Sequence, residues 1–327
     1  MPSTLVGPSP SLIRSFRIVE CVSGARKILI MTELSAEVPS RGSEGTEFLK
    51  GHGTENDFVL LPDESAAIDL TADMVRSVCG RRAGLGADGV LRIARAGALV
   101  DAGVLGDLPE DVRDDMWFMD YRNADGSLAE MCGNGIRVFA HALVATGRAQ
   151  LGEIDVGTRA GLRPTTVSAV RAATASVSVD MGTPRLLGTT TARIGADRFP
   201  GIGVDVGNPH LACVVPGLDE NGLAALDVAM LPGYDSDFFP EGVNVEIATP
   251  LVDGRVHMRV HERGAGETRS CGTGIVATAF AALADADRDS GDVTVSVPGG
   301  EVHVSIERGR ATMTGPSVLV AAGRLWL

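Results

Sequence analysis

The 327-residue chain has few cysteines, no excess of basic residues and no long apolar segment. Its five cysteines are an odd number without C-x-x-C spacing, so neither a disulfide framework nor a zinc or other metal site is expected. The formal net charge of −13 disfavours a nucleic acid or an anionic membrane as a partner. No apolar run approaches the roughly 18 residues of a membrane span, and no signal-peptide pattern is found, which predicts a cytoplasmic location.

Length and composition indicate two globular domains. At roughly 100–200 residues per domain, 327 residues correspond to two. Hydrophobic residues make up 44% of the chain and charged residues 22%, as in ordinary globular proteins. Serine, proline and glycine are scattered through residues 1–46, which we expect to form a flexible extension that contains Met31 as an alternative start.

Hydrophobic patterning predicts a mixed α/β fold in which strands outnumber helices. Helices are expected at 69–79, 135–146 and 274–284. Residues 262–273 read as a polar, glycine-rich loop, and 101–115 as an acidic, irregular insertion. The segments 318–320 and 323–327 resemble a final hairpin.

The chain also contains an internal repeat. MCGNGIRVFAHAL begins at Met131 and SCGTGIVATAFAA begins at Ser270. Each places a cysteine before Gly-x-Gly-Ile and an alanine-rich apolar segment. The repeat distance of about 140 residues is too long for a solenoid unit and indicates a duplicated domain.

The repeat places Cys132 and Cys271 at the entrances of two predicted helices. A helix N-terminus presents unpaired N–H groups and partial positive charge, which can hold a carboxylate and are expected to lower the pKa of a thiol. If the two loops face each other, one thiolate can remove the α-proton of an amino acid while the opposite thiol returns a proton. The negative charge of the intermediate would be stabilised by the same N–H groups, so no cofactor is needed. Cys21, Cys79 and Cys213 lack such surroundings and are expected to be structural.

At this point the chain resembles the diaminopimelate epimerase family. The resemblance covers roughly residues 48–327, and its motifs stand in the family's order: HGTENDFVLL (52–61), GLGADG (84–89), YRNADGS (121–127), MCGNGIR (131–137), GNPH (207–210), EGVNVEI (241–247) and ERGAGETRSCGTG (262–274). It implies cofactor-independent interconversion of LL- and meso-2,6-diaminopimelate in lysine and peptidoglycan-precursor biosynthesis. Members are often dimeric, so a homodimer is implied as well.

The resemblance also implies two pseudo-symmetric domains, each with a mostly antiparallel sheet rolled around a central helix and the active site in the cleft between them. We place these domains at 47–176, completed by 316–327, and at 177–315. Cys132 and Cys271 would be the proton donor and acceptor, exchanging roles with reaction direction. The backbone at Gly133–Asn134 and Gly272–Thr273 would hold the reacting carboxylate, with His210 supporting the thiols. The rest of the substrate would be recognised by Asn56, Asn123, Asn208, Asn244, Glu262 and Arg263.

Two positions depart from the family pattern. Glu55 stands where a loop glycine is usual, which puts the conformation of that loop in doubt. Gly89 stands where glutamine often contacts substrate, so Gly89 is left out of the site.

Other interpretations remain open at this stage. Asn123 and Asn208 are also natural turn residues, His210 suits a partly buried structural histidine, and Glu262 with Arg263 suits an exposed ion pair. A proline or hydroxyproline racemase would use the same two thiols. A thiol-based redox protein would instead join Cys132 and Cys271 by a disulfide, and a non-catalytic amino-acid-binding module would not exchange protons.

Overall fold

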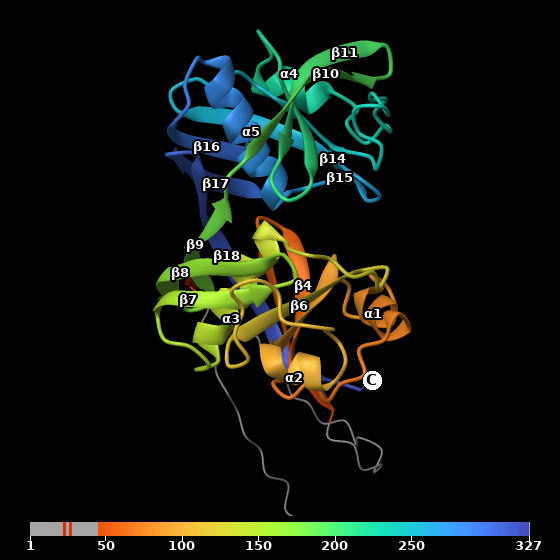
Figure 1. Cartoon of the computed structure of the whole chain (residues 1–327), viewed down its shortest axis with the longest axis vertical. Coiled ribbons are helices and arrows are strands. Elements are labelled where there is room, and N and C mark those ends of the chain that lie inside the picture. The colour runs from red at the N-terminus through yellow and green to blue at the C-terminus, as the bar shows by residue number, and fades with distance from the viewer. Residues whose placement is uncertain (1–21, 24–25, 28–44, 327) are drawn as a thin grey trace, which may run out of the picture. The chain divides into compact units, whose positions relative to one another are not determined.

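The computed structural model describes residues 22–23, 26–27 and 45–326 (Figure 1). Cys21, Met31 and almost all of the predicted extension lie outside the described residues. The exceptions are residues 45–46 and the strands β1 (Val22–Ser23) and β2 (Arg26–Lys27), which pair with each other in antiparallel fashion. One compact unit comprises Glu44–Leu327, and its first strand already begins at Thr46.

The first half of this unit is a closed barrel of eight strands around one helix. Each barrel strand pairs with the next, and β9 closes the barrel by pairing with β18. The strands are β3 (Thr46–Gly53), β4 (Asn56–Pro62), β5 (Gly89–Arg95), β6 (Trp117–Asn123), β7 (Gly152–Thr158), β8 (Gly161–Arg171), β9 (Thr174–Gly182) and β18 (Arg310–Leu325). Helix α3 (Gly133–Ala145) lies inside the barrel and contacts most of its strands.

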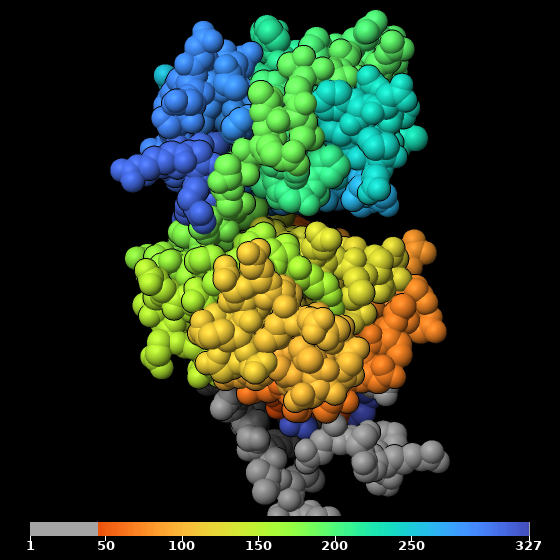
Figure 2. All heavy atoms as spheres, viewed as in Figure 1, coloured from red at the N-terminus to blue at the C-terminus, as the bar shows by residue number. Residues whose placement is uncertain are grey.

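In the second half an open sheet surrounds α5 (Gly272–Asp285). The same sheet continues from β18 through the strands of this half. They are β10 (Arg185–Ile194), β11 (Asp197–Asp205), β12 (Pro209–Val214), β13 (Asn244–Ala248), β14 (Arg255–Glu262), β15 (Gly266–Thr268), β16 (Gly291–Val297) and β17 (Gly300–Glu307). Figure 2 shows the green segment of β9 and β10 passing from one half to the other.

The strand pairing explains the sequence repeat. Most neighbours are antiparallel, but β4–β5, β6–β7, β12–β13 and β14–β16 are parallel, and a parallel pair needs a crossover connection. The crossover between β6 and β7 contains α3, and the one between β14 and β16 contains α5. Because strands surround each crossover helix, it must be apolar on nearly all sides, which accounts for the two alanine-rich segments.

Three shorter helices lie at the periphery of the halves. They are α1 (Ala72–Cys79), α2 (Ala96–Asp101) and α4 (Glu220–Ala225). Helix α1 starts three residues later than predicted because Thr71 caps it, with Oγ1 accepting from the N–H of Met74. No described helix has the length and apolar character required to cross a membrane.

The predicted mixed α/β class is confirmed, but two local predictions are wrong, those for the final hairpin and for the loop 262–273. The final hairpin is instead the single strand β18, with an irregular register between Leu319 and Ala321. The segment 101–115 is irregular after Asp101, as predicted, and its Leu105 and Val112 pack with α2. The loop 262–273 contains strand β15, which pairs with β14. In each case a tertiary partner decides the conformation.

The proposed domain boundaries fall inside strands of the structure. Residues 176 and 177 both belong to β9, and 315 and 316 both belong to β18. These two long strands pair with each other and carry the sheet from one half into the other. The division into 47–176 with 316–327 and 177–315 stays a prediction.

Candidate active site

Both candidate cysteines cap the central helices. Cys132 is the N-cap of α3, and its Sγ accepts a hydrogen bond from the N–H of Gly135 at 3.3 Å. Cys271 is the N-cap of α5 and accepts from the N–H of Gly274 at 3.4 Å. Both are free thiols. Sulfur therefore takes the place of the oxygen that usually caps a helix, and the sequence repeat becomes a repeat of geometry.

The structure brings the two cysteine loops into contact. A Cβ added to Gly272 would lie 2.8 Å from the Cα of Gly133, so only glycine allows this approach. Asn134 Nδ2 donates to the carbonyl oxygen of Ser270 at 3.1 Å. The first turns of α3 and α5 thus adjoin, and their N–H groups, which have no partner within the helix, gather beside the thiols.

Asn56 is held next to Cys132. Its Oδ1 lies 3.6 Å from Cys132 Sγ and 3.3 Å from Asn134 Nδ2, and its own Nδ2 donates to Asp88 at 2.8 Å. Asp88 belongs to the GLGADG turn, so that motif orients the Asn56 amide.

The departure at Glu55 has a structural explanation. Thr54 and Glu55 form the two-residue turn between β3 and β4, with φ values of 49° and 62°. Such turns need left-handed residues, which glycine adopts most easily. Here Glu55 is held by an ion pair with Arg269, and Thr54 Oγ1 lies 2.7 Å from Ser270 Oγ. The turn thereby docks against the segment that leads into Cys271.

Three other predicted residues gather in the second half. Asn208 Oδ1 lies 3.0 Å from His210 Nε2. Asn244 is buried, and both ends of its amide bind backbone: Nδ2 donates to Pro209 O at 3.2 Å, and Oδ1 accepts from the N–H of Arg263 at 2.9 Å. Asn244 therefore joins the GNPH segment to the loop after β14.

Glu262 and Arg263 do not form an ion pair with each other. Glu262 accepts a hydrogen bond from Thr268, and burial raises its pKa. The exposed Arg263 guanidinium contacts the carbonyl oxygen of Glu241 at 2.8 Å, and no carboxylate among the described residues pairs with it. That cation remains available for an anionic ligand.

Asn123 is not brought to the thiols by any observed contact. Its Nδ2 donates to Ser127 Oγ at 3.0 Å within its own turn. Its strand partner is Gly89, where an added Cβ would lie 2.6 Å from the ring of Tyr121. Tyr121 is 8% exposed, and its ring packs against Gly89, the position at which the family resemblance led us to consider a glutamine.

Two buried charged residues of this region were missed in the sequence. Arg137 is fully buried, and its guanidinium donates to Thr54 Oγ1 and Asn134 Oδ1 without a carboxylate partner in the described chain. Glu246 is also fully buried and contacts His210. A charged residue within an apolar segment, as in GNGIRVF and NVEIA, is the signal that could have identified them. No group of three or more described His, Cys, Asp or Glu side chains has a metal-ligand arrangement.

The expectation that the helix ends lower the thiol pKa values is wrong. Burial raises the pKa of Cys132 to about 11, and the nearby charge of Glu262 adds to the effect. The pKa of Cys271 is also raised well above its usual range, by burial and then by Glu262 and Glu246. A helix N-terminus contributes typically about 0.3–1 kcal/mol, less than the ~1.4 kcal/mol of a tenfold change in acidity. Desolvation of the thiolate therefore outweighs it.

Alkylation of Cys132 is accordingly expected to be slow at neutral pH. Because the thiolate is the nucleophile, the rate with iodoacetamide should rise about tenfold per pH unit between about pH 7 and 10, still below the pKa of about 11. Peptide mass spectrometry measures the alkylation rate at this residue. Glutathione, whose thiol has an unshifted pKa, serves as the control. A rate that levels off near pH 8 would contradict the prediction.

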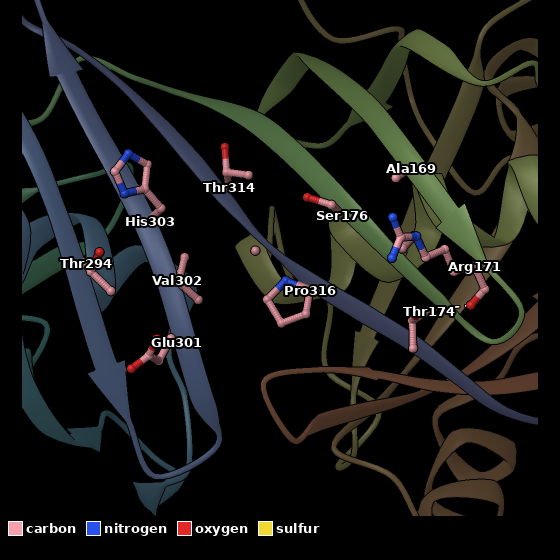
Figure 3. Close-up of a pocket in the computed structure, with 12 residues that line it drawn as sticks. Ala169, Arg171, Thr174, Ser176, Thr294, Glu301, Val302, His303, Thr314 and Pro316 are labelled. Atoms are coloured by element: carbon pink, nitrogen blue, oxygen red, sulfur yellow. Dashed lines mark hydrogen bonds between the residues drawn. The ribbon is translucent and has the colours of Figure 1, made fainter. Parts of the chain in front are cut away.

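One groove of the structure lies elsewhere. It encloses about 610 Å³, and Figure 3 shows it between the β8–β9 hairpin, with Arg171 and Ser176, and the β16–β17 hairpin, with Glu301 and His303. Neither Cys132 nor Cys271 lines it. This groove is therefore not the candidate site, which is defined by the meeting of the two capped helices.

The fold belongs to the proline racemase type. A probable proline racemase from Agrobacterium radiobacter K84 superposes with a TM-score of 0.60 at 15% identity, over 86% of this chain and 93% of that one. A hydroxyproline epimerase from Agrobacterium vitis gives 0.58 at 16% identity, over 88% and 94%. At such identities the likeness concerns the fold alone.

Sequence comparison identifies the family within this class. The diaminopimelate epimerase family matches residues 48–187 and 202–320. The diaminopimelate epimerase of Rhodococcus jostii RHA1 is 60% identical over 85% of this chain and 96% of its own length, and that of Mycobacterium tuberculosis CDC 1551 is 59% identical over the same shares. The chain therefore belongs to the diaminopimelate epimerase family.

Proposed function

We propose that this protein interconverts LL- and meso-2,6-diaminopimelate without a cofactor, in lysine and peptidoglycan-precursor biosynthesis. The observation that carries the proposal is the contact between two cysteine-capped helix ends, at Gly133 and Gly272. The names of relatives 60% and 59% identical support the substrate.

Cys132 and Cys271 carry the chemistry in this proposal. One thiolate removes the α-proton, the electron pair is delocalised into the α-carboxylate, and the opposite thiol delivers its proton to the other face of the carbon. One thiol is consumed and one is formed, so the two cysteines exchange protonation states in each turnover. In the reverse direction their roles are reversed.

Backbone N–H groups stabilise the intermediate. Gly135 and Gly274 donate to the two sulfur atoms, which leaves the N–H groups at Gly133–Asn134 and Gly272–Thr273 for the reacting carboxylate. Their positions are set by the two helices, so they need no rearrangement as charge develops.

The remaining residues recognise the rest of the substrate, either directly or by holding a residue that does. Arg263 binds the distal carboxylate, because its planar guanidinium suits bidentate contact and has no carboxylate partner among the described residues. Asn56, Asn123 and Asn208 offer amide donors and acceptors. Asn244 and Glu262 act in this scheme by holding the loop that carries Arg263. A proline-type substrate offers no second charged centre for that arginine.

A thiolate must form although both thiol pKa values are raised. Arg137 favours the Cys132 thiolate, because its buried positive charge has no carboxylate partner among the described residues. The α-ammonium group of the substrate would add a second positive charge beside the thiols. Deprotonation is thereby coupled to substrate binding.

The cellular setting is part of the same proposal. We infer a cytoplasmic enzyme, because free thiols require a reducing compartment and a biosynthetic reaction supplies the cell interior. A homodimer is inferred from the family resemblance, and light scattering of the full chain tests it.

Solvent-deuterium exchange tests the activity. The wild-type protein in D₂O is expected to incorporate deuterium at an α-carbon of LL-diaminopimelate and to produce the meso isomer without added cofactor. L-proline and trans-4-hydroxy-L-proline, offered under the same conditions, should not exchange. Exchange with the proline substrates alone would overturn the assignment in favour of the racemase interpretation.

A further inference from the structure

Glu246 is a buried acid for which the proposed proton transfer has no use. It lies on β13, beside His210 on the parallel strand β12, and both side chains are fully buried. Glu246 Oε1 is 2.7 Å from His210 Nδ1. The other carboxylate oxygen, Oε2, is buried without a hydrogen-bond partner among the described residues. An unpaired carboxylate would be costly here, so the contact with His210 needs an explanation.

Hydrogen-bond chemistry determines where the protons lie. His210 Nε2 is 3.0 Å from Asn208 Oδ1, and an amide oxygen can only accept, so Nε2 carries a proton. The contact between Nδ1 and Oε1 then needs one more proton, which belongs either to the imidazolium or to the acid. In both states the pair of Glu246 and His210 is neutral overall. Burial raises the pKa of Glu246, which favours retention of that shared proton.

The hydrogen-bond series from Glu246 through His210 ends at Asn208. Because its oxygen is held by His210, its NH₂ group is fixed in orientation, and that group has no partner among the described residues. The other end of this series, Glu246, lies next to the helix turn that follows Cys271. A Cβ on Gly274, in the first turn of α5, would be 2.5 Å from Glu246 Oε1. The titratable groups that interact with the pair are Glu262, Cys271 and Cys213.

We propose that Glu246 is a positioning residue that acts through His210 to present the Asn208 NH₂ group to an oxygen of the substrate. A proton shared with His210 also offsets part of the negative charge with which Glu246 disfavours a thiolate on Cys271. The inference rests on the proposed epimerase function for its substrate, but the protonation of His210 can be measured without turnover.

Two substitutions distinguish the role of the hydrogen bond to His210 from the role of the carboxylate charge of Glu246. In Glu246→Gln the side-chain amide can donate to His210 Nδ1, as the protonated acid does, so Nε2 keeps its proton and KM should stay within about threefold of wild type. Glu246→Leu leaves Nδ1 without a partner and frees Asn208, so KM should rise about tenfold, the worth of one hydrogen bond, with a smaller change in kcat. Glu301→Gln, an exposed acid on β17, is the control with unchanged kinetics.

Nitrogen-15 NMR of the histidine side chains gives the independent readout. Nε2 of His210 should be protonated in the wild type and in Glu246→Gln, and should lose its fixed protonation in Glu246→Leu. An unprotonated Nε2 in the wild type overturns the proposal, as does a Gln variant as impaired as the Leu variant. If Glu246→Leu does not fold, the Gln variant and the wild-type spectrum still decide. A wild type that fails to epimerise diaminopimelate refutes the proposed function but leaves the His210 result valid.

Discussion

Cys132→Ala and Cys271→Ala are each expected to lower kcat for epimerisation by about 10³-fold or more, because each removes a general acid or base that no other group replaces. The loss of kcat should be equally large in both reaction directions, since every turnover needs both a thiolate and a thiol. The measurement is the conversion of LL- to meso-diaminopimelate together with incorporation of solvent deuterium.

Cys79→Ala is the matched control for these variants. Cys79 is buried near the end of α1, with its pKa likewise raised to about 11 by burial, but it lies in a separate apolar cluster. Its replacement should cost some stability and leave kcat near wild type. Full turnover in both Cys132→Ala and Cys271→Ala would remove the two-thiol mechanism.

Gly272→Ala is expected to lower kcat by about 10²-fold while the protein stays folded. The new Cβ would lie 2.8 Å from the Cα of Gly133 and 3.0 Å from the amide nitrogen of Asn134. Both are backbone atoms, so the two capped helix ends must move apart. A separation of a few tenths of an ångström already misplaces two thiols that have to reach one carbon from opposite faces.

Gly106→Ala tests whether the effect is specific to this contact. No atom lies within 4 Å of the position of its added Cβ, so it changes a glycine without displacing a neighbour. Circular dichroism and thermal unfolding report the fold of both variants. Wild-type kcat in Gly272→Ala would mean that the close approach of the loops does not matter for activity.

Much of the active region could be predicted from short motifs. The repeat predicted that two helices begin beside Cys132 and Cys271, and α3 and α5 begin there. Capping residues and apolar periodicity depend only on residues close together in the sequence, so they can be recognised without knowledge of the fold.

Prediction failed where a distant partner determines the outcome. Strand β18 continues through Val318–Leu325 because it pairs with β9 and β3, whereas its sequence alone resembles a hairpin. Glu55 adopts a turn conformation typical of glycine because Arg269 and Ser270 hold the turn in place. Neither partner is adjacent in sequence.

The sequence by itself determined the duplicated cysteine element, the mixed α/β class and the family, since each depends on residue order alone. The tertiary structure decided the electrostatics. It buried Cys132 and Cys271 deeply enough to raise their pKa values, left Arg137 without a carboxylate partner in the described chain, and placed Glu246 against His210. The physical reason is that desolvation and charge interactions depend on distance in space, which the spacing of motifs along a chain does not contain.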